Sequence, residues 1–331
     1  MKIESPLAVG TLNVAGLRKP RKRFTLIKKL IEQRLDVISL QETHLVHDNE
    51  IEAMAKQWGG VVHTSAGTNR SRGVATLFNP SHPPEAIKLI KSHDRMVFSS
   101  LKLDTQHIMI VSIYSPCGPK DKIMFLNDLY NKIVEYSQAE SIDSIICMGD
   151  FNITLKDLDV LSGEGHSTDV RRALNNTIEG LNFIDSWRLK HPEERTYTWS
   201  RGSVARRLDY IFVSECLGAY IHDSYVKGIG FSDHRMVVTN FEFAPFKHGK
   251  GSYKLNVSLL KDTDYCNMII DTIIKTNQEY DDLNPQLRWE MIKNNVEEVS
   301  QQYSKFLQRE KRLNNNNYIK RLNILQNEFI D

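Results

Sequence analysis

The sequence predicts an α/β fold in which two mixed β-sheets pack together and helices flank them. Up to about residue 243, short runs rich in Val, Ile and Phe alternate with longer amphipathic segments. The short runs have the length and composition of strands, and Gly, Pro or polar residues bound them. Many strands with few helices between them favour two packed sheets with helices on the outside.

Eight apolar runs are predicted strands, and three amphipathic segments are predicted helices. The strands are Leu7–Val14, Val37–Leu40, Gly73–Phe78, Met96–Leu103, Ile108–Tyr114, Ser144–Met148, Leu208–Val213 and Met236–Phe243. Apolar residues recur near helical spacing in Arg23–Arg34 and Asp121–Tyr136. A third helix, Asp169–Gly180, ends at a glycine.

The character of the chain changes after residue 243, which predicts a catalytic domain over 1–244 and an extension over 245–331. Pro245–Gly251 reads as a polar linker. Three helices are predicted beyond it, at Tyr265–Thr276, Gln286–Glu310 and Tyr318–Glu328. We expect this extension to be a helical addition or the start of a truncated second domain, such as a reverse-transcriptase region.

Composition narrows the class of protein. Of 331 residues, 40% are hydrophobic and 25% are charged, and no apolar run reaches the roughly eighteen residues that span a membrane. Met1–Gly10 carries too little positive charge and too short an apolar stretch for a secretory signal peptide. The four cysteines form no CxxC pair, so we expect free thiols in a reducing compartment. These features predict an intracellular protein, nuclear or cytoplasmic, with no membrane partner and no obligate protein partner.

The net charge of +2 does not by itself indicate a nucleic-acid-binding protein. Basic residues nevertheless gather in loops, and the densest run lies between residues 18 and 23. Clustered Lys and Arg side chains are most often solvated surface. Because these loops flank the motifs described next, we expect them to contact phosphates of double-stranded DNA. The predicted nucleic-acid-binding residues are Arg18, Arg21, Lys22, Arg23, Arg72, Thr198 and Arg206.

Five short polar segments each follow or begin a predicted strand, where a rigid scaffold presents functional side chains. They are Thr11-Leu12-Asn13-Val14, Leu40-Gln41-Glu42-Thr43-His44, Gly149-Asp150-Phe151-Asn152, Arg207-Leu208-Asp209-Tyr210 and Ser232-Asp233-His234. Taken singly, each has an ordinary explanation, such as a turn, a helix cap or a solvent-facing strand position. All five in one chain, each at a strand end, indicate a common site.

These residue types suit hydrolysis of a phosphodiester, which needs an activated water, a cation and hydrogen-bond donors around the phosphate oxygens. Glu42 closes an apolar strand and is the best candidate ligand for Mg²⁺ or Mn²⁺, which prefer oxygen ligands. Asp150 can activate the water, and Asn13 and Asn152 can donate to phosphate oxygens. His234 can donate to the scissile phosphate if Asp209 holds it in the cationic form.

In this order, the five segments resemble the endonuclease/exonuclease/phosphatase superfamily, which includes exonuclease III, apurinic endonucleases and DNase I. The resemblance covers Asn13 to His234 and implies a four-layer α/β/β/α sandwich. Within the superfamily the chain is similar to the endonuclease domain of LINE-type (non-LTR) retrotransposons. Two stretches carry that likeness: Arg195-Thr196-Tyr197-Thr198-Trp199-Ser200 ahead of Arg207-Leu208-Asp209-Tyr210-Ile211, and Gly251-Ser252-Tyr253-Lys254-Leu255-Asn256.

The resemblance also implies roles for single residues. Glu42 would bind the metal with Asn13 close by, and Asp233 would lie near it. Tyr114 would contact the phosphate or orient Asp150, and Asn152 would stabilise the transition state. Two positions depart from the family pattern, since Cys117 stands where Asn is common and Leu12 where Trp is common. These departures concern substrate contacts rather than the residues assigned to chemistry.

The function expected from the resemblance is a metal-dependent endonuclease that nicks DNA and leaves a 3′-hydroxyl, as in target-site nicking by a retrotransposon. An apurinic-site repair endonuclease or a 3′–5′ exonuclease would use the same catalytic residues. A phosphatase acting on lipid or inositol phosphates is open on fold alone. An alternative of another class is a non-catalytic nucleic-acid-binding module, against which the intact carboxylates and His234 argue.

Overall fold

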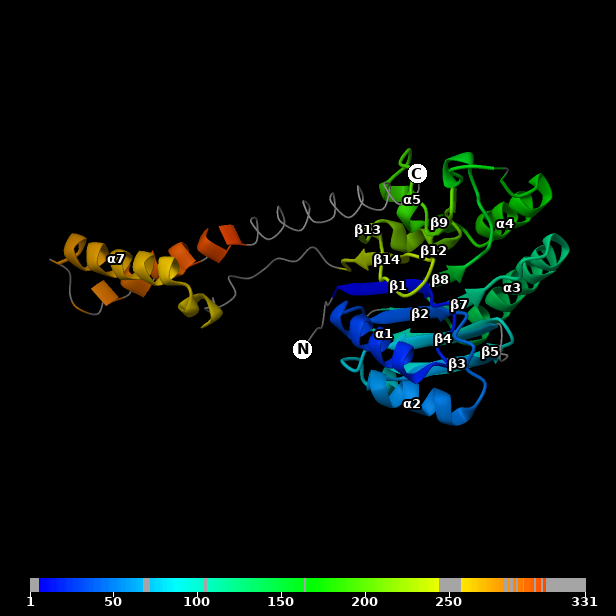
Figure 1. The fold of residues 1–331 in the computed structure, drawn as a ribbon, viewed down its shortest axis with the longest axis horizontal. Helices are drawn as coiled ribbons and strands as arrows, with labels where there is room; N and C mark the ends of the chain where they lie inside the picture. The colour runs from blue at the N-terminus through cyan, green and yellow to red at the C-terminus, as the bar shows by residue number, and fades with distance from the viewer. Residues whose placement is uncertain are drawn as a thin grey trace. The chain divides into compact units, whose positions relative to one another are not determined.

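In the computed structural model the described residues are 6–67, 72–103, 106–163, 165–243 and 257–281, with parts of 285–307. The chain divides into two compact units, Met1–Pro245 and Phe246–Asp331. Within the described ranges, none of the helices has the length and apolar character needed to cross a membrane. The ribbon of Figure 1 carries the labels of the elements.

The first unit contains two six-stranded sheets and a short hairpin. The first sheet has the spatial order β13 (Ile221–Lys227), β14 (Met236–Phe241), β1 (Leu7–Asn13), β2 (Val37–Gln41), β4 (Arg72–Phe78), β3 (Val62–Gly67). The second has the order β5 (Ile87–His93), β6 (Met96–Lys102), β7 (His107–Tyr114), β8 (Ser144–Asp150), β12 (Asp209–Ser214), β9 (Phe183–Asp185). The hairpin consists of β10 (Trp199–Arg201) and β11 (Val204–Arg206).

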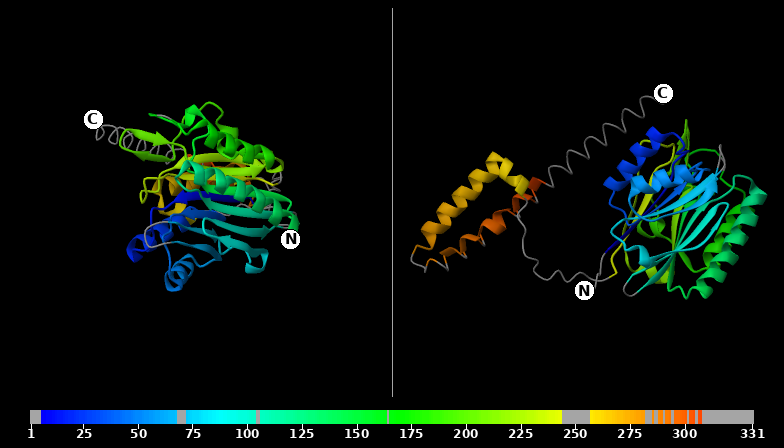
Figure 2. Two further views of the ribbon diagram at one scale, coloured as in Figure 1. Left: turned by 90° about the vertical axis from the view of Figure 1, so that its right-hand side faces the viewer. Right: turned by 90° about the horizontal axis from the view of Figure 1, so that it is seen from below.

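The helices described in the first unit are α1 (Pro20–Glu32), α2 (Asp48–Trp58), α3 (Pro119–Ala139), α4 (Thr168–Gly180), α5 (Ser186–Lys190) and α6 (Glu215–Gly218), with 3-10 turns η1 (Pro84–Ala86) and η2 (Asp157–Asp159). Helix α7 (Thr263–Glu279) and the 3-10 turn η3 (Val257–Lys261) belong to the second unit. Helices α1 and α2 lie against the first sheet, and α3 and α4 lie against the second (Figure 2). Their buried apolar side chains belong to the cores on those faces. The predicted four-layer sandwich is confirmed.

A third apolar core lies between the two sheets. Val9 and Val37 of the first sheet meet Ile110 and Ile146 of the second there, and all four are fully buried. Because the central strands are covered on both faces, they read as nearly continuous apolar runs rather than as alternating patterns. All eight predicted strands are present, with ends that differ by at most two residues from those expected.

The pairing of the strands brings distant polar residues to one end of the sandwich. The pairs β1–β2 and β7–β8 are parallel, so the ends of β7 and β8 place Tyr114 opposite Asp150. The antiparallel pair β8–β12 places Asp209 opposite the same Asp150. Gly149 allows the close approach of β7, since a Cβ there would lie 2.0 Å from the backbone oxygen of Ile113.

The second unit is helical where it is described. Asp262 caps the start of helix α7, and its carboxylate accepts hydrogen bonds from the backbone N–H groups of Asp264 and Tyr265. The Tyr265 hydroxyl lies 2.7 Å from Ser300 Oγ, and the Tyr303 hydroxyl donates to Asp262 at 2.8 Å. The helix predicted at 265–276 is confirmed, and the described residues between 285 and 307 are helical. The helix predicted at 318–328 and the linker predicted at 245–251 lie outside the described residues.

Candidate active site

Glu42 is held by two donors from both sheets. Its Oε1 accepts a hydrogen bond from Asn13 Nδ2 at 2.9 Å and one from the Tyr114 hydroxyl at 2.8 Å. Its Oε2 lies 3.4 Å from His44 Nε2. Burial raises the pKa of Tyr114 far above its ordinary value, and the neighbouring Glu42 raises it further. Tyr114 is therefore a neutral phenol that donates to Glu42 at any pH near neutrality.

The backbone around this group is strained. Glu42 and Asn152 both have φ of +52°, and Ala15, His44 and Arg72 also have positive φ. Residues other than glycine adopt this region at a cost, and such residues concentrate at functional sites. The turn at Glu42 is stabilised by backbone hydrogen bonds that Gly16 and Leu17 donate to the carbonyls of Glu42 and Thr43. The strain thus presents polar side chains from the strand ends at a common site.

Asp150 lies at the centre of the group and is 1% exposed. Its Oδ2 accepts from Asn13 Nδ2 at 2.9 Å, and its Oδ1 accepts from the backbone N–H of Asn152 at 2.9 Å. Burial raises the pKa of Asp150 to about 7, with the Asp209 carboxylate contributing in the same direction. A carboxyl group with this pKa is suited to exchange a proton near neutral pH.

His234 and Asp209 form a buried pair beside Asp150. His234 Nδ1 lies 2.8 Å from Asp209 Oδ2, and His234 Nε2 lies 3.9 Å from Asp150 Oδ2. Burial alone would lower the pKa of His234, but the Asp209 carboxylate, together with Asp150, raises it to about 10. His234 is therefore an imidazolium whose Nε2–H faces the catalytic end of the sandwich.

Thr198 and Arg207 position this pair. The fully buried Thr198 hydroxyl accepts hydrogen bonds from the backbone N–H groups of Leu208 and Asp209, at 2.9 and 3.1 Å. Arg207 is also buried and makes ion pairs with Asp159 and Asp185. Neither side chain is exposed, so Thr198 does not fit the nucleic-acid contact that the sequence suggested for it. Their hydrogen bonds instead fix the start of β12, and with it the direction of Asp209.

The donor set fits a divalent cation. Glu42, Asp150 and Asp209 supply three carboxylates against one imidazolium, and Asp209 Oδ1 is buried without a hydrogen-bond partner among the described residues. Ligand atoms of Asp150, Asp209 and His234 lie within 4.8 Å of one another. Because Asp209 engages Nδ1 of a cationic His234, we assign that trio to proton chemistry and leave Glu42 with Asn13 as the candidate ligands.

Asp233 and the predicted DNA-binding residues differ in their exposure and in their hydrogen-bond partners. Asp233 is exposed, and its Oδ2 accepts from Trp199 Nε1 at 3.0 Å. Arg23 is 5% exposed and donates to the carbonyl of Leu17, which does not fit a phosphate contact. Lys22 Nζ donates to the carbonyls of Val14 and Ala15. Arg23 and Lys22 thereby stabilise the loop between β1 and α1.

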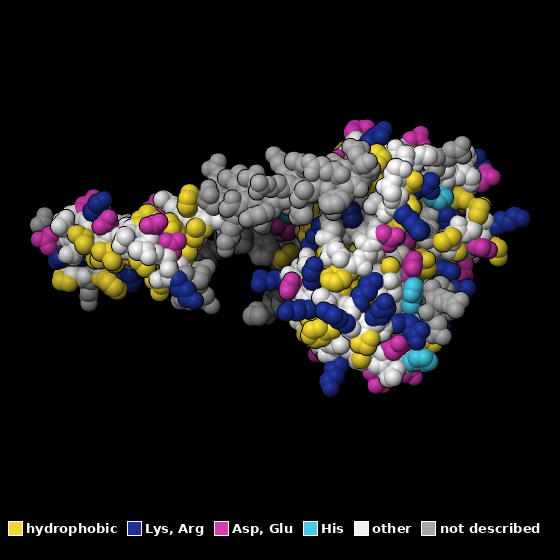
Figure 3. All heavy atoms as spheres, viewed as in Figure 1, with side chains coloured by type: hydrophobic (Ala, Val, Ile, Leu, Met, Phe, Trp, Pro, Cys, Tyr) yellow, Lys and Arg dark blue, Asp and Glu magenta, His cyan; other side chains and the backbone are white. Residues whose placement is uncertain are grey.

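The remaining basic residues reach the surface. Arg21 is exposed, Arg18 lies 3.5 Å from Glu50, and Arg72 pairs with Asp94 at 2.8 Å. Arg206, from β11, is half-buried. Figure 3 shows Lys and Arg side chains gathered over the region of α1 on the face that it draws. The basic face therefore lies beside the loops that carry Asn13 and Glu42.

Sequence reasoning missed one charged residue close to Asp150. Lys122, in the first turn of α3, is 4% exposed and interacts electrostatically with Asp150. The residues around Lys122 have the pattern of an amphipathic helix, in which a lysine is usually solvated. Its burial is a tertiary property that the local pattern does not carry.

Comparisons with known proteins agree with this geometry. A protein of the transposon TX1 from Xenopus laevis, described as an uncharacterized 149 kDa protein, is 30% identical over 277 residues, which are 80% of this chain and 20% of that protein. The chain thus spans about a fifth of the length of this relative. Among solved structures, an AP endonuclease from Archaeoglobus fulgidus is 26% identical, with a TM-score of 0.60 over 71% of this chain and 99% of that one.

A second solved structure supports the fold. The AP endonuclease LMAP from Leishmania major is 21% identical, with a TM-score of 0.64 over 74% of this chain and 90% of that one. The model of the Endonuclease/Exonuclease/phosphatase family matches residues 10–234, which contain every residue of the site described above. These likenesses support a nuclease or other phosphodiesterase. The chain belongs to the Endonuclease/Exonuclease/phosphatase family.

Proposed function

We propose that residues 1–244 form a metal-dependent endonuclease that nicks double-stranded DNA and leaves a 3′-hydroxyl, as a retrotransposon needs when it opens its target site. One observation carries the proposal: the carboxylate of Asp150 lies between the Asn13–Glu42–Tyr114 group and the Asp209–His234 pair. The transposon relative supports the physiological setting, and the solved AP endonucleases support DNA as the substrate class.

Asp150 is the residue that we assign to the attacking water. Its two oxygens are fixed by Asn13 and by the backbone of Asn152, so the carboxylate can accept a proton without reorienting. The water oxygen then attacks phosphorus, the bond from phosphorus to O3′ breaks, and O3′ leaves with the bonding electron pair and takes up a proton from solvent. The products are a 5′-phosphate and a 3′-hydroxyl.

His234 and Asn152 are the donors that we assign to the phosphate. The Nε2–H of the His234 cation is oriented by the bond from Nδ1 to Asp209, so it offsets negative charge that develops on a phosphate oxygen. The Asn152 side chain donates to the Ser115 carbonyl at 2.9 Å, which holds its amide beside Asp150. Donors fixed in advance are effective because they need no reorganisation during the reaction.

Glu42 would hold Mg²⁺ or Mn²⁺, and Asn13 would lie beside the cation. Asp233, which directly precedes His234 in the sequence, would lie near it. When bound, such a cation offsets charge on the phosphate and orients it. The hydrogen bonds from Asn13 and Tyr114 both go to Glu42 Oε1, so the cation would take Oε2, which lies 3.4 Å from His44 Nε2. Tyr114 thereby fixes the carboxylate rather than exchanging a proton itself.

A nicking assay on supercoiled plasmid decides the proposal. We expect conversion to the open circle in Mg²⁺, no conversion in EDTA, and nicks that a DNA polymerase can extend without repair of the 3′ end. The matched variant Asp150→Asn keeps the volume of the side chain and is expected to lose activity. A chain that leaves plasmid intact in both Mg²⁺ and Mn²⁺ would overturn the assignment.

An abasic-site endonuclease is the second candidate, because the solved structure with 26% identity is an AP endonuclease. Such an enzyme would use the same catalytic residues and differ in the loops that receive the abasic sugar. Rates on matched duplexes with and without one abasic site separate the two. A preference of more than about a hundredfold for the abasic duplex would favour repair over target-site nicking.

A further inference from the structure

His44 follows the candidate metal ligand Glu42 by two positions, and one of its ring nitrogens has no partner. His44 Nε2 is buried and makes no hydrogen bond among the described residues. It lies 3.4 Å from Glu42 Oε2, but this contact does not have the geometry of a hydrogen bond. Buried polar atoms are nearly always satisfied, so an unsatisfied one beside a carboxylate indicates a ligand from outside the chain.

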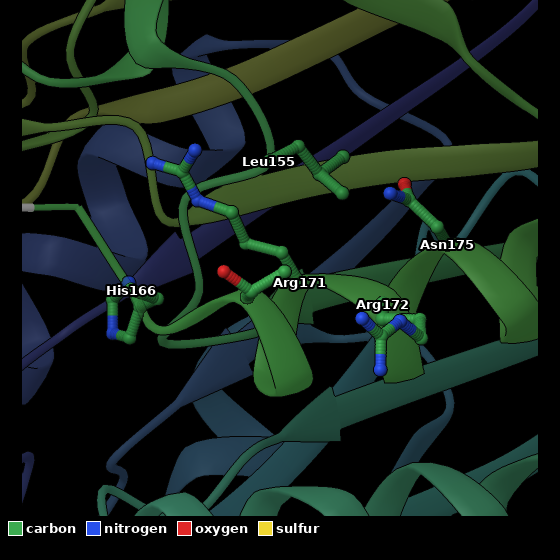
Figure 4. Close-up of a pocket in the computed structure, with 6 residues that line it drawn as sticks. Leu155, His166, Arg171, Arg172 and Asn175 are labelled. Atoms are coloured by element: carbon green, nitrogen blue, oxygen red, sulfur yellow. The ribbon is translucent and has the colours of Figure 1, made fainter.

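Two other histidines provide a comparison. His166 lines a cavity of about 380 Å³, and its Nδ1 accepts a hydrogen bond from the backbone N–H of Thr154 at 3.1 Å (Figure 4). His107 Nε2 is buried without a partner, as His44 Nε2 is, but no carboxylate pairs with it in the described ranges. Within the part of the chain that the structure describes, His44 is therefore the histidine that combines an unpartnered buried nitrogen with a neighbouring carboxylate.

The backbone fixes the turn that carries His44. Glu42 and His44 both have positive φ, at +52° and +57°. The Glu42 carbonyl accepts a hydrogen bond from the backbone N–H of Gly16 at 2.7 Å, and the His44 N–H donates to the carbonyl of Arg72 at 3.1 Å. The turn is thus tied both to the loop between β1 and α1 and to the start of β4. Such ties hold the two side chains in place before a ligand binds.

Gly16 makes room for the His44 ring. A Cβ on Gly16 would lie 2.9 Å from His44 Nδ1, which is closer than such atoms approach in proteins. Gly16 also has φ of +86°, a conformation that favours glycine. The loop backbone therefore packs directly against the Nδ1 side of the ring, while Nε2 lies beside Glu42.

Glu42 Oε2 and His44 Nε2 suit one cation. Two ligand atoms that each lie about 2.1 Å from a metal ion, at a right angle, are about 3 Å apart, which is near the 3.4 Å between these atoms. Glu42 Oε1 is already occupied by the hydrogen bonds from Asn13 and Tyr114. Asn13 Oδ1 accepts a hydrogen bond from the backbone N–H of Ala15 at 3.1 Å. The carboxylate oxygen and the imidazole nitrogen are therefore the atoms of this group left for a cation.

We propose that His44 Nε2 binds the cation together with Glu42 Oε2, so that the turn after β2 supplies one carboxylate oxygen and one imidazole nitrogen. The inference rests on the proposed function and extends it, because it names a ligand of the cation assigned there. Mg²⁺ prefers oxygen ligands, whereas transition-metal ions such as Mn²⁺ also bind nitrogen. The site should therefore bind Mn²⁺ more tightly than Mg²⁺, and this preference should depend on His44.

Electron spin echo spectroscopy of the Mn²⁺-loaded chain tests the ligand directly. The nitrogen nucleus of a coordinated imidazole modulates the echo of Mn²⁺, so we expect this modulation in the wild type. Labelling the histidines with the heavy nitrogen isotope should change its frequencies. His44→Asn should abolish the modulation, because asparagine tolerates positive φ and carries no imidazole. His82→Asn is the matched control, since His82 Nε2 lies 3.1 Å from the Asp36 carboxylate, and it should keep the modulation.

Calorimetry measures how much His44 contributes to the affinity. We expect His44→Asn to weaken Mn²⁺ binding about tenfold or more, because even the loss of a residue that only supports a metal ligand usually costs that much. Mg²⁺ binding should change less, so the ratio of the Mn²⁺ affinity to the Mg²⁺ affinity should fall. His82→Asn should leave both affinities unchanged.

A wild-type echo without nitrogen modulation would overturn the assignment. A modulation that persists in His44→Asn, or equal Mn²⁺ affinities of that variant and the wild type, would overturn it too. The isotope experiment on the wild type needs no variant, so it decides whether an imidazole binds the cation even if His44→Asn does not fold. Mn²⁺ binding through His44 without plasmid nicking would overturn the nuclease proposal alone, whereas nicking without nitrogen modulation would overturn the His44 ligand alone.

Discussion

His234 Nδ1 lies 2.8 Å from Asp209 Oδ2 inside a site where both side chains are almost fully buried. The two residues come from the start of β12 and the loop before β14, which belong to different sheets. Their contact therefore joins the two halves of the sandwich at its catalytic end. It also fixes the imidazolium that we assign to the phosphate.

Asp209 and His234 should act as one unit. Asp209→Ala and His234→Ala are each expected to lower the single-turnover nicking rate by orders of magnitude, because each removes the same oriented donor. The double variant should be little slower than the slower single variant. A double-mutant cycle measures this directly. Strictly multiplicative losses would mean that Asp209 serves another group and that His234 is oriented by a different partner.

Glu42 should be required for the cation and not for the fold. Glu42→Gln keeps the shape of the side chain but removes a charge, so we expect nicking to be lost and the affinity for Mn²⁺, measured by calorimetry, to fall. The exposed Glu52→Gln on α2 is the matched control and should leave both unchanged. Mn²⁺ affinity within a few-fold of wild type would remove Glu42 from the metal site.

The basic residues Arg21 and Arg23 of α1 should have two different functions. Arg21 is exposed, so Arg21→Glu is expected to weaken DNA binding and to reduce its salt dependence. Arg23 is buried against the carbonyl of Leu17, so Arg23→Glu should lower the free energy of unfolding by about 2–4 kcal/mol. Salt titrations and chemical denaturation of the two variants test the division. Equal stability of Arg23→Glu and wild type would contradict it.

The central strands, and the grouping of the residues predicted for the active site, could be predicted from the sequence because both depend on local pattern. Strands such as β7 are buried on both faces and are therefore nearly continuous apolar runs, and the candidate site residues lie at or just beyond strand ends. Asn13, Glu42, Asp150, Asp209 and His234 all have this character. The structure brings them together within one network of contacts.

The edges of the sheets were not predictable in the same way. β13 is half exposed and contains His222 and Asp223, while β5 contains lysines. Charged residues on an edge strand discourage pairing with other chains, and they also remove the apolar pattern that identifies a strand. Helix α2 was missed because only Met54 and Trp58 are buried in it.

The partners of the catalytic residues depend on contacts that are distant in sequence. Arg207 begins one of the five polar segments, yet its guanidinium pairs with Asp159, 48 positions earlier. Thr198 lies ten positions before Leu208, and its hydroxyl accepts a hydrogen bond from the Leu208 backbone N–H. Nothing in the local sequence of either residue distinguishes a buried hydrogen-bonding position from an exposed one.

His63 should make stability depend on pH. Burial lowers its pKa to about 4 from an ordinary value of 6.5, and Ser99 Oγ lies 2.8 Å from Nδ1. Below pH 6.5 the unfolded chain therefore binds a proton that the folded chain does not, so stability falls as the pH drops from about 6.5 to about 4. Above pH 6.5 this contribution is fully present.

The variant His63→Gln should remove the part of the pH dependence of stability that His63 causes, because glutamine does not titrate. We expect the loss of stability between pH 7 and pH 5, measured by chemical denaturation, to be smaller in the variant than in the wild type. Some dependence should remain, since burial also lowers the pKa of His166. His222 is mostly exposed, so His222→Gln is the matched control and should keep the wild-type dependence. Identical losses in His63→Gln and the wild type would show that His63 is protonated as readily in the folded chain as in the unfolded one.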